Sequence, residues 1–205
     1  MERPDRHPFL IVSGPRSEPR VALTFHGQGD PSLSVRLLSL LEAGGARATV
    51  LAVGTWLEEQ PQVARRILSG GHELGNHTMH HDDISTLPAE QAFAEIADCA
   101  AVLRRLTGSP GRWFRPSQAR DCTPALAALA RRAGYVHCLG YDLDSLDFTD
   151  PGPATITRTV LDGVRSGSVV SLHLGHPGTV TAVPAILDGL RARALQPVTM
   201  SELID

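Results

Sequence analysis

The chain has 205 residues, of which 42% are hydrophobic, 20% are charged and 4% are aromatic, and its formal net charge is -3. This length suits one domain with a substantial core or two small ones, and the near-neutral charge provides no long-range field that would attract nucleic acid or an anionic membrane. All 19 basic residues are arginines, which excludes Schiff-base and P-loop lysine chemistry.

The cysteines and the apolar runs exclude further classes. Cys99, Cys122 and Cys138 are odd in number and show no CxxC spacing, so neither a disulfide framework nor a thiolate zinc site is expected. No apolar run approaches the ~18 residues of a membrane span, and residues 1–20 are polar and proline-rich, unlike a signal peptide. We therefore expect a chain that is soluble as given, with its compartment undetermined.

From residue 20 onward, short apolar runs alternate with longer amphipathic stretches, a pattern typical of βα units around a parallel sheet. The pattern predicts strands at 21–25, 48–53, 73–76, 113–115, 135–141, 168–173 and 197–200. It predicts helices at 32–43, 56–69, 88–106, 123–133, 154–164 and 180–193. Together these elements make about seven βα repeats. They indicate one domain over residues 21–205, preceded by an N-terminal arm at 1–20.

Unusual polar residues follow the predicted strands. They are His26, His77, Arg115, Asp144 and His173. An open doubly wound sheet would spread these positions along a line, whereas a (β/α) barrel brings them together on one face, where such enzymes build their active sites. The placement favours an α/β fold of the barrel type.

The densest chemical signal is the histidine-rich segment at 76–83. His77 and His81 are four residues apart, so on a helical turn both rings would project from one face and could bind a divalent metal ion; a solvated loop is the alternative. Asp30 is the best candidate for a third ligand, but it also suits the N-cap of the following helix. His26 is a candidate general base, a third nitrogen ligand or a hydrogen-bonded core histidine.

Five segments resemble, in order and approximate spacing, the motifs of the polysaccharide deacetylases (carbohydrate esterase family 4, NodB homology domain). They are Leu-Thr-Phe at 23–25, His-Thr-Met-His-His at 77–81, Phe-Arg-Pro at 114–116, Asp-Leu-Asp-Ser-Leu-Asp-Phe at 142–148 and Ser-Leu-His at 171–173. The resemblance covers nearly all of residues 20–205.

The resemblance implies a distorted (β/α)7-type barrel, NodB-like and related to the TIM barrel. It implies a hydrolase that acts on linear amide C–N bonds and removes acetyl groups from N-acetylglucosamine units of a glycan such as chitin or peptidoglycan. The family uses a divalent metal ion, for which zinc is expected and cobalt, manganese or nickel are alternatives. Its members are usually exported or bound to the cell envelope, but no signal peptide or anchor is recognisable in this chain.

The resemblance also assigns roles to residues. His77 and His81 would bind the metal, and His173 would protonate the leaving amine. Arg115 would hold the catalytic base, and Asp147 would in turn hold Arg115; a structural ion pair between these two is the alternative.

The same resemblance suggests how substrate would bind. Leu172 and Phe148 would form the wall of a small pocket for the acetyl methyl group. The backbone N–H of Gln118 would contribute to an oxyanion hole. Tyr141 is among the few aromatic side chains available to stack on a sugar, so a short or shallow cleft is expected.

The first motif departs from the family. It usually reads Thr-Phe-Asp-Asp-Gly, with the first Asp as base and the second as metal ligand, but here the segment at 24–30 reads Thr-Phe-His-Gly-Gln-Gly-Asp. Either His26 replaces the base while Asp30 completes the metal site, or His26 binds the metal and Asp30 takes the proton. The first arrangement is preferred, because His26 stands where the base normally stands.

Three functions are therefore in competition. The first is a metal-dependent de-N-acetylase of an amino-sugar polymer or oligomer, working through a metal-activated water. The second is a catalytically impaired relative that binds glycan or metal, and the third is a hydrolase of other amides or of O-acetyl esters on the same scaffold. The sequence does not specify the oligomeric state.

Overall fold

A computed structural model describes residues 9–119 and 121–205. Its strands are β1 (Leu10–Ile11), β2 (Arg20–Gly27), β3 (Thr49–Ala52), β4 (Glu73–Asn76), β5 (Trp113–Phe114), β6 (His137–Leu139), β7 (Leu143–Asp144), β8 (Val169–His173) and β9 (Gln196–Val198). Its helices are α1 (Pro31–Ala43), α2 (Gly54–Glu59), α3 (Pro61–Ser69), α4 (Ala89–Thr107), α5 (Pro124–Arg132), α6 (Pro153–Gly163), α7 (Pro177–Ala192) and α8 (Met200–Ile204).

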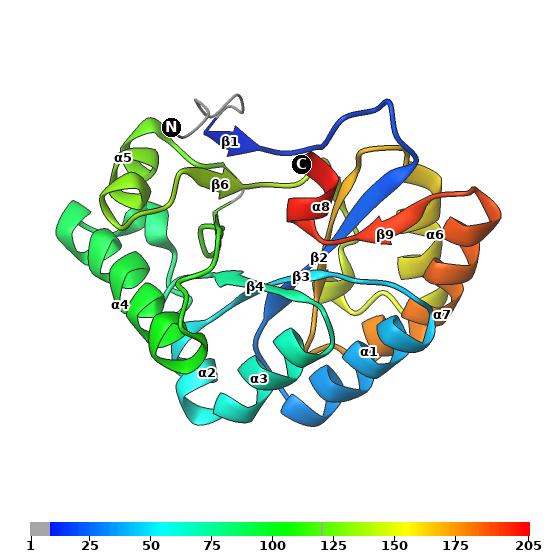
Figure 1. Ribbon diagram of the computed structural model, residues 1–205, viewed down its shortest axis with the longest axis horizontal. Coiled ribbons are helices and arrows are strands. Elements are labelled where there is room, and N and C mark those ends of the chain that lie inside the picture. The colour runs from blue at the N-terminus through cyan, green and yellow to red at the C-terminus, as the bar shows by residue number, and fades with distance from the viewer. Residues whose placement is uncertain (1–8, 120) are drawn as a thin grey trace.

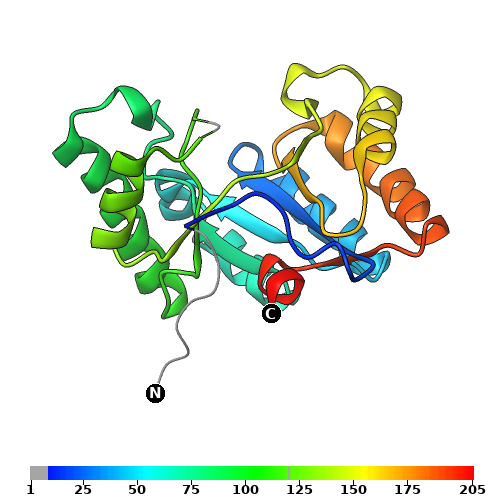
Figure 2. The same cartoon turned by 90° about the horizontal axis from the view of Figure 1, so that it is seen from above.

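The strands form one curled sheet with the order β1-β6-β5-β4-β3-β2-β8-β7, and β9 lies beside β2. The pairs between these strands are all parallel. Helices surround the sheet on its outer side (Figures 1 and 2), as expected when each parallel strand is followed by a crossover helix. The distorted (β/α) barrel predicted from the sequence is confirmed.

The segment before β2 takes part in the sheet. β1 pairs with β6, and further along the chain Ser13 forms an antiparallel bridge with Ser168 at the start of β8. The N–H of Gly14 donates to the carbonyl of Gly167 at 2.8 Å. A side chain at Gly167 would lie 2.6 Å from the Gly14 carbonyl oxygen, and its φ of +75° also favours glycine. This segment therefore spans from β6 to β8.

The two faces of each central strand have different partners, because successive side chains point to opposite sides. In β2, Val21, Leu23 and Phe25 belong to the large core cluster shared with the helices. Ala22 belongs to a second cluster inside the barrel, together with Trp113 and residues of α8. Thr24 and His26 follow Ala22 at alternate positions of β2, so they lie on the same inner face. The alternation therefore directs the side chain of His26 into the barrel.

The helices differ from the sequence prediction at two places. The helix predicted at 56–69 is divided into α2 and α3, because Pro61 lacks an amide N–H and begins a new helix. α8 was not predicted; it begins with a capping box between Thr199 and Glu202. No helix in residues 9–119 and 121–205 is long and apolar enough to cross a membrane.

Candidate active site

A cavity of about 560 Å³ opens at the carboxyl ends of the central strands, in the size range of ligand pockets. The residues that line it are His26, Gln28, His81, Arg115, Pro116, Gln118, Ala119, Tyr141, Asp144, Phe148, Ser171, His173 and His176. Seven of the residues to which the sequence assigned a role are among them. His77 and Asp147 are buried behind this lining, whereas Asp30 and Leu172 lie elsewhere.

Asp30 is the N-cap of α1 rather than part of the cavity. Its Oδ1 accepts a hydrogen bond from the backbone N–H of Ser32 at 2.7 Å. Hydrogen bonding with the side chain of Ser32, and then with its backbone N–H, lowers the pKa of the exposed carboxyl. Pro31 occupies the first turn, where its missing N–H costs nothing. This placement favours the capping role of Asp30 over its expected role as metal ligand or proton acceptor, because the capping geometry directs its carboxylate to the helix.

Asp30→Ala should lower the melting temperature by about 2–4 °C and leave the activity of the folded protein unchanged, because only the helix cap is lost. Asp30→Ser, which restores a capping oxygen, should recover most of the lost stability. Thermal unfolding followed by circular dichroism measures both variants. A fall in turnover per folded molecule in Asp30→Ala, with Asp30→Ser equally inactive, would return Asp30 to the active site.

Leu172 faces away from the cavity. It is fully buried in the large core cluster between β8 and the helices. Its neighbours Ser171 and His173 line the cavity, since alternate residues of a strand point to opposite faces. The expected role of Leu172 as a wall of the acetyl pocket is corrected for this reason.

The segment that carries His77 and His81 is a loop, not the helical turn expected from the sequence. Thr78 and His81 have φ values of 68° and 64°, in the left-handed region that non-glycine residues rarely adopt. The backbone N–H of Thr78 donates to Oδ1 of Asn76 at 2.8 Å, and its hydroxyl donates to Ser117 Oγ at 2.9 Å. Although the segment is not helical, the ring centroids of His77 and His81 lie only 5.0 Å apart.

A hydrogen-bonded circuit joins His26, His77 and Arg115. The chemistry of these groups determines which atom donates and which accepts in each bond. His77 Nδ1 lies 3.0 Å from the backbone carbonyl of Arg115, which can only accept, so Nδ1 carries the proton. His77 Nε2 then accepts from His26 Nδ1 at 2.8 Å. His26 Nε2 is left as an acceptor, which agrees with the guanidinium Nη1 of Arg115 at 3.3 Å, a group that can only donate.

Burial keeps these rings neutral. Burial, with smaller contributions from His77 and Arg115, lowers the pKa of His26 well below its ordinary value. Burial and the nearby His81 do the same for His77. At neutral pH, His26 therefore presents an unprotonated Nε2 toward the cavity, which is the state that a general base requires.

This arrangement does not fit the metal site that the resemblance implies. The Nε2 lone pair of His77 is already used by the N–H of His26, and His77 lies behind the cavity lining. Asp30, the only carboxylate expected as a ligand, caps α1. Throughout residues 9–119 and 121–205, no three His, Cys, Asp or Glu side chains are placed to bind a metal ion together.

Arg115 is a buried cation held mainly by uncharged acceptors. Its Nε donates to the carbonyl of Leu139 at 2.9 Å, and its Nη2 donates to the carbonyl of Gly140 at 3.0 Å and to the hydroxyl of Thr24 at 2.8 Å. Burial lowers the pKa of Arg115 to about 10, so the guanidinium stays charged at neutral pH. It therefore presents a positive charge to the cavity beside His26.

Asp147 contacts His173 rather than Arg115, which corrects the expected pairing. Its Oδ1 lies 2.7 Å from His173 Nδ1, and its Oδ2 accepts from the backbone N–H of His173 at 2.8 Å and from the Thr179 hydroxyl at 2.6 Å. Burial by itself raises the pKa of Asp147, but the hydrogen bonds from His173 and Thr179 outweigh it and keep the pKa below its ordinary value. The ionised carboxylate fixes the His173 ring with Nδ1–H toward Asp147.

Three predicted substrate contacts lie around the cavity mouth. Phe148 is 48% exposed and meets the His173 ring edge-on, with centroids 5.5 Å apart. Tyr141 stacks near the guanidinium carbon of Arg115 at 5.3 Å. The side-chain amide of Gln118 donates to the carbonyl of His81 at 2.8 Å, which ties the third-motif loop to the histidine loop.

Ser171 and Thr179 contact the central residues of the site, and the sequence had assigned no role to either. Ser171 lines the cavity, and its hydroxyl lies 3.0 Å from His26 Nε2. Its position two residues before His173 on a strand is a signal that could have identified it, since both side chains must face the same side. Thr179 supports Asp147 from the first turn of α7, and no sequence pattern indicates this contact.

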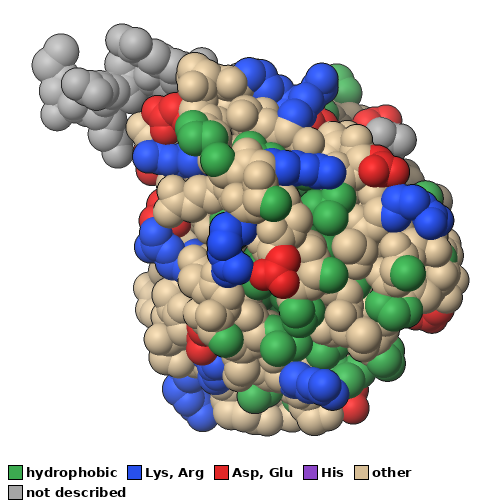
Figure 3. Space-filling view, turned by 90° about the vertical axis from the view of Figure 1, so that its right-hand side faces the viewer, with side chains coloured by type: hydrophobic (Ala, Val, Ile, Leu, Met, Phe, Trp, Pro, Cys, Tyr) green, Lys and Arg blue, Asp and Glu red, His purple; other side chains and the backbone are tan. Residues whose placement is uncertain are grey.

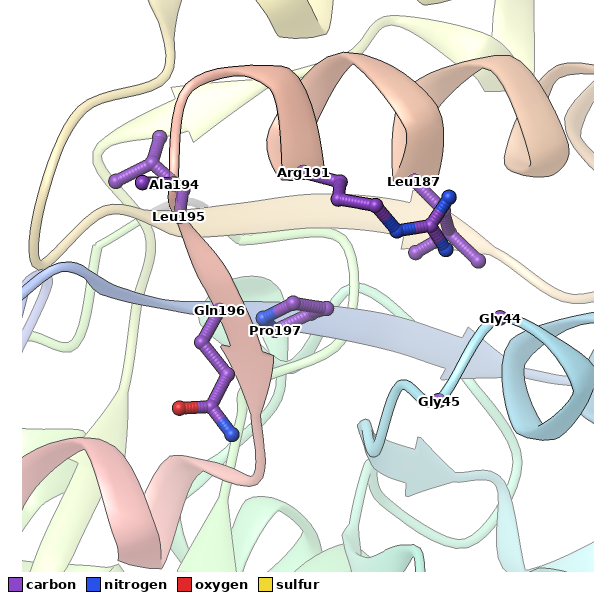
Figure 4. Close-up of a pocket in the computed structure, with 8 residues that line it drawn as sticks. All are labelled: Gly44, Gly45, Leu187, Arg191, Ala194, Leu195, Gln196 and Pro197. Carbon is purple, nitrogen blue, oxygen red and sulfur yellow. The ribbon is translucent and has the colours of Figure 1, made fainter.

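A smaller cavity of about 260 Å³ lies between the end of α1, the end of α7 and β9, and among its lining residues only Arg191 and Gln196 have polar side chains (Figure 4). Arg191 is paired with Asp188 at 2.9 Å. The side of the molecule that carries α6 and α7 mixes arginines, carboxylates and hydrophobic groups without a region of one charge (Figure 3).

Comparison with known proteins identifies the relatives of this chain. Residues 13–137 match the polysaccharide deacetylase family. A peptidoglycan-N-acetylglucosamine deacetylase of Bacillus cereus is 32% identical over 168 residues, which cover 82% of this chain and 78% of the relative. A chitooligosaccharide deacetylase of Bradyrhizobium sp. is 33% identical over 180 residues, which cover 83% and 76%.

Solved structures agree with this assignment. The crystal structure of a peptidoglycan N-acetylglucosamine deacetylase superimposes with a TM-score of 0.89 at 26% identity, covering 95% of this chain and 92% of that one. A pseudoenzyme of carbohydrate esterase family 4 from Bacillus anthracis shares the fold, with a TM-score of 0.90, 22% identity and coverage of 97% and 70%. As the sequence motifs predicted, the chain belongs to the polysaccharide deacetylase family of hydrolases.

Proposed function

We propose that this protein removes the acetyl group from N-acetylglucosamine units of a glycan of the peptidoglycan or chitin type. One observation carries the proposal: a neutral His26, the cation of Arg115 and the Asp147–His173 pair all serve one cavity. The relatives named for peptidoglycan and chitooligosaccharide deacetylation support the substrate class.

Amide hydrolysis needs a proton acceptor for the attacking oxygen, a positive charge near the carbonyl oxygen and a proton donor for the leaving nitrogen. Residues of the cavity can supply each of these. The unprotonated Nε2 of His26 can accept a proton from the attacking oxygen. The Arg115 guanidinium stabilises the negative charge that develops on the carbonyl oxygen. His173, with Nδ1–H bound to Asp147, can carry a second proton on Nε2 and donate it to the leaving nitrogen.

The cavity also suits a small part of a glycan rather than a long stretch of polymer. The exposed ring of Phe148 stands at the mouth beside His173, where an apolar sugar face can stack. The acetyl group would then enter toward His26. Substrates of a few sugar units should therefore be turned over nearly as well as long chains.

The metal-activated water predicted from the resemblance is the competing route, in which His77 and His81 would bind the ion. The hydrogen bond from His26 to His77 opposes it, because it uses the nitrogen lone pair that the ion needs. We therefore expect acetate release to persist after treatment with EDTA and removal of the chelator. Elemental analysis of the same sample checks that the metal is gone, and activity that is lost and then restored by added zinc would establish the metal route.

The proposed function is tested by acetate release from chitooligosaccharides, peptidoglycan and acetylxylan. We expect release from the first two substrates and none from acetylxylan. Release from acetylxylan alone would indicate an O-acetyl esterase. No release from any of the three, with or without added zinc, cobalt or manganese, would support a relative that binds glycan without turnover.

A further inference from the structure

Two cysteines meet outside the cavity, between the start of α5 and strand β6. Cys138 is the middle residue of β6 and is fully buried, and Cys122 directly precedes Thr123, the N-cap of α5. Cys122 packs against the buried cluster to which Cys138 belongs. Both are free thiols, and their side chains are hydrogen-bonded to each other. The two sulfur atoms therefore face one another.

The βα architecture brings these two positions together. A helix that connects two parallel strands runs back along the sheet, so its first turn lies near the carboxyl end of the strand that follows. α5 and β6 are in contact, and Figure 1 shows them side by side near one edge of the sheet. Because the whole of α5 separates Cys122 from Cys138 in the sequence, no local spacing indicated the pair.

The two thiols differ in access and in acidity. Cys122 is half-buried, so a reagent in solution can reach it, whereas Cys138 is covered. The hydrogen bond from the Cys138 thiol, together with the positive charge of Arg131, lowers the pKa of Cys122. The same contact and burial raise the pKa of Cys138. Cys122 is therefore the thiol that reacts first, and Cys138 lies directly behind it.

We propose that Cys122 and Cys138 are a redox pair, which closes to a disulfide in an oxidising environment and thereby fastens the loop before α5 to the sheet. This loop joins β5 to α5, and Pro116, Gln118 and Ala119 within it line the cavity. Ala119 also packs against the cluster that contains Cys138. The disulfide would thus hold one wall of the cavity in place. The inference does not depend on the proposed deacetylation.

The oxidant is a low-molecular-weight disulfide, and the reaction is thiol–disulfide exchange. The Cys122 thiolate bonds to one sulfur of the small disulfide, whose S–S bond breaks and releases one small thiol. The Cys138 sulfur then bonds to Cys122 Sγ and expels the second small thiol. The protons of the two cysteines pass to the two released thiols. Two protein thiols are oxidised and one small disulfide is reduced, with no other reactant.

The test equilibrates the full-length protein with oxidised glutathione or with excess dithiothreitol. Free thiols are then blocked with N-ethylmaleimide in denaturant, and the protein is digested without reduction and analysed by mass spectrometry. The oxidised sample should contain one cross-linked peptide pair that carries Cys122 and Cys138. Cys99 should be blocked in both samples, because it is fully buried and its thiol contacts the carbonyl of Ala52 at 3.6 Å.

Thermal unfolding of the same samples tests the structural effect. The disulfide closes a loop that contains all of α5, which restricts the unfolded chain. The oxidised protein should therefore melt about 5–10 °C above the reduced protein.

Cys122→Ser removes the half-buried thiol and keeps a side chain of similar shape, so it should fold. It should show no cross-linked pair and the same melting temperature with either reagent. Cys99→Ala is the matched control, which should still form the pair and still gain stability on oxidation. The proposal is overturned if Cys122 and Cys138 are both blocked in the oxidised sample, or if Cys122 carries only glutathione. It is also overturned if the cross-linked protein melts no higher than the reduced protein.

Discussion

Asp147→Asn is expected to lower kcat by about 10³–10⁴-fold with little change in KM. The carboxylate accepts from Nδ1–H, from the backbone N–H of His173 and from the Thr179 hydroxyl. An amide at this position keeps the volume but loses the negative charge that stabilises a protonated His173. Its NH₂ group would also face the ring, which favours the wrong tautomer. Steady-state kinetics of acetate release measure the effect.

Asp150→Asn provides the control for this experiment. Asp150 is an exposed carboxylate three residues along, and it bonds to Nδ1 of His176 at 2.9 Å in the same manner. Because His176 has no place in the proposed chemistry, this variant should keep kcat within about two-fold, an effect below 1 kcal/mol in the activation barrier. A comparable loss in both variants would mean that the loop requires negative charge in general, and it would remove the specific role of Asp147.

The stability of the protein should fall as the pH drops below about 6.5. His77 is fully buried, and burial lowers its pKa well below the ordinary value. In the unfolded chain the same ring takes up a proton below about pH 6.5, whereas the native ring does not. Its contribution is therefore complete above pH 6.5 and is lost toward acid, at about 1.4 kcal/mol per pH unit until the native ring protonates.

Urea unfolding between pH 7.5 and 5.5, on EDTA-treated protein, measures this loss. His77→Gln should be less stable at pH 7.5 but should show a flatter pH dependence. His80→Gln is the control of opposite sign: the hydrogen bond that the His80 ring donates to the Glu95 carboxylate raises the pKa of His80, so its contribution is present in acid and is lost as pH rises. The pH dependence should become steeper in that variant, and an unchanged slope in His77→Gln would contradict the assignment.

Local sequence was sufficient to predict the inner lining of the barrel but not its contacts. The strand at 20–27 alternates between helix-facing and interior residues, so His26 had to point inward wherever the sheet closed. The same alternation excludes Leu172 from the cavity and includes Ser171, although motif resemblance had drawn attention to the leucine. Periodicity was therefore a better guide to orientation here than family analogy.

The sequence did not predict which groups the charged residues of the site contact. Asp147 and Arg115 are far apart in sequence, and both had several acceptable partners until the fold placed them. The chain brings Asp147 to His173 across 26 residues and surrounds Arg115 with the carbonyls of Leu139 and Gly140. Such contacts depend on distances between loops of different strands, which no local pattern encodes.

The amino-acid sequence by itself determined the fold class, the family and the set of polar residues at the carboxyl ends of the strands, because periodicity and motif spacing are local properties of the chain. Only the tertiary structure decided that Asp30 caps a helix and that His26 is bonded to both His77 and Ser171. The direction of each proton in that circuit is set by a backbone carbonyl and a guanidinium of Arg115, groups that meet the rings only after the sheet has curled.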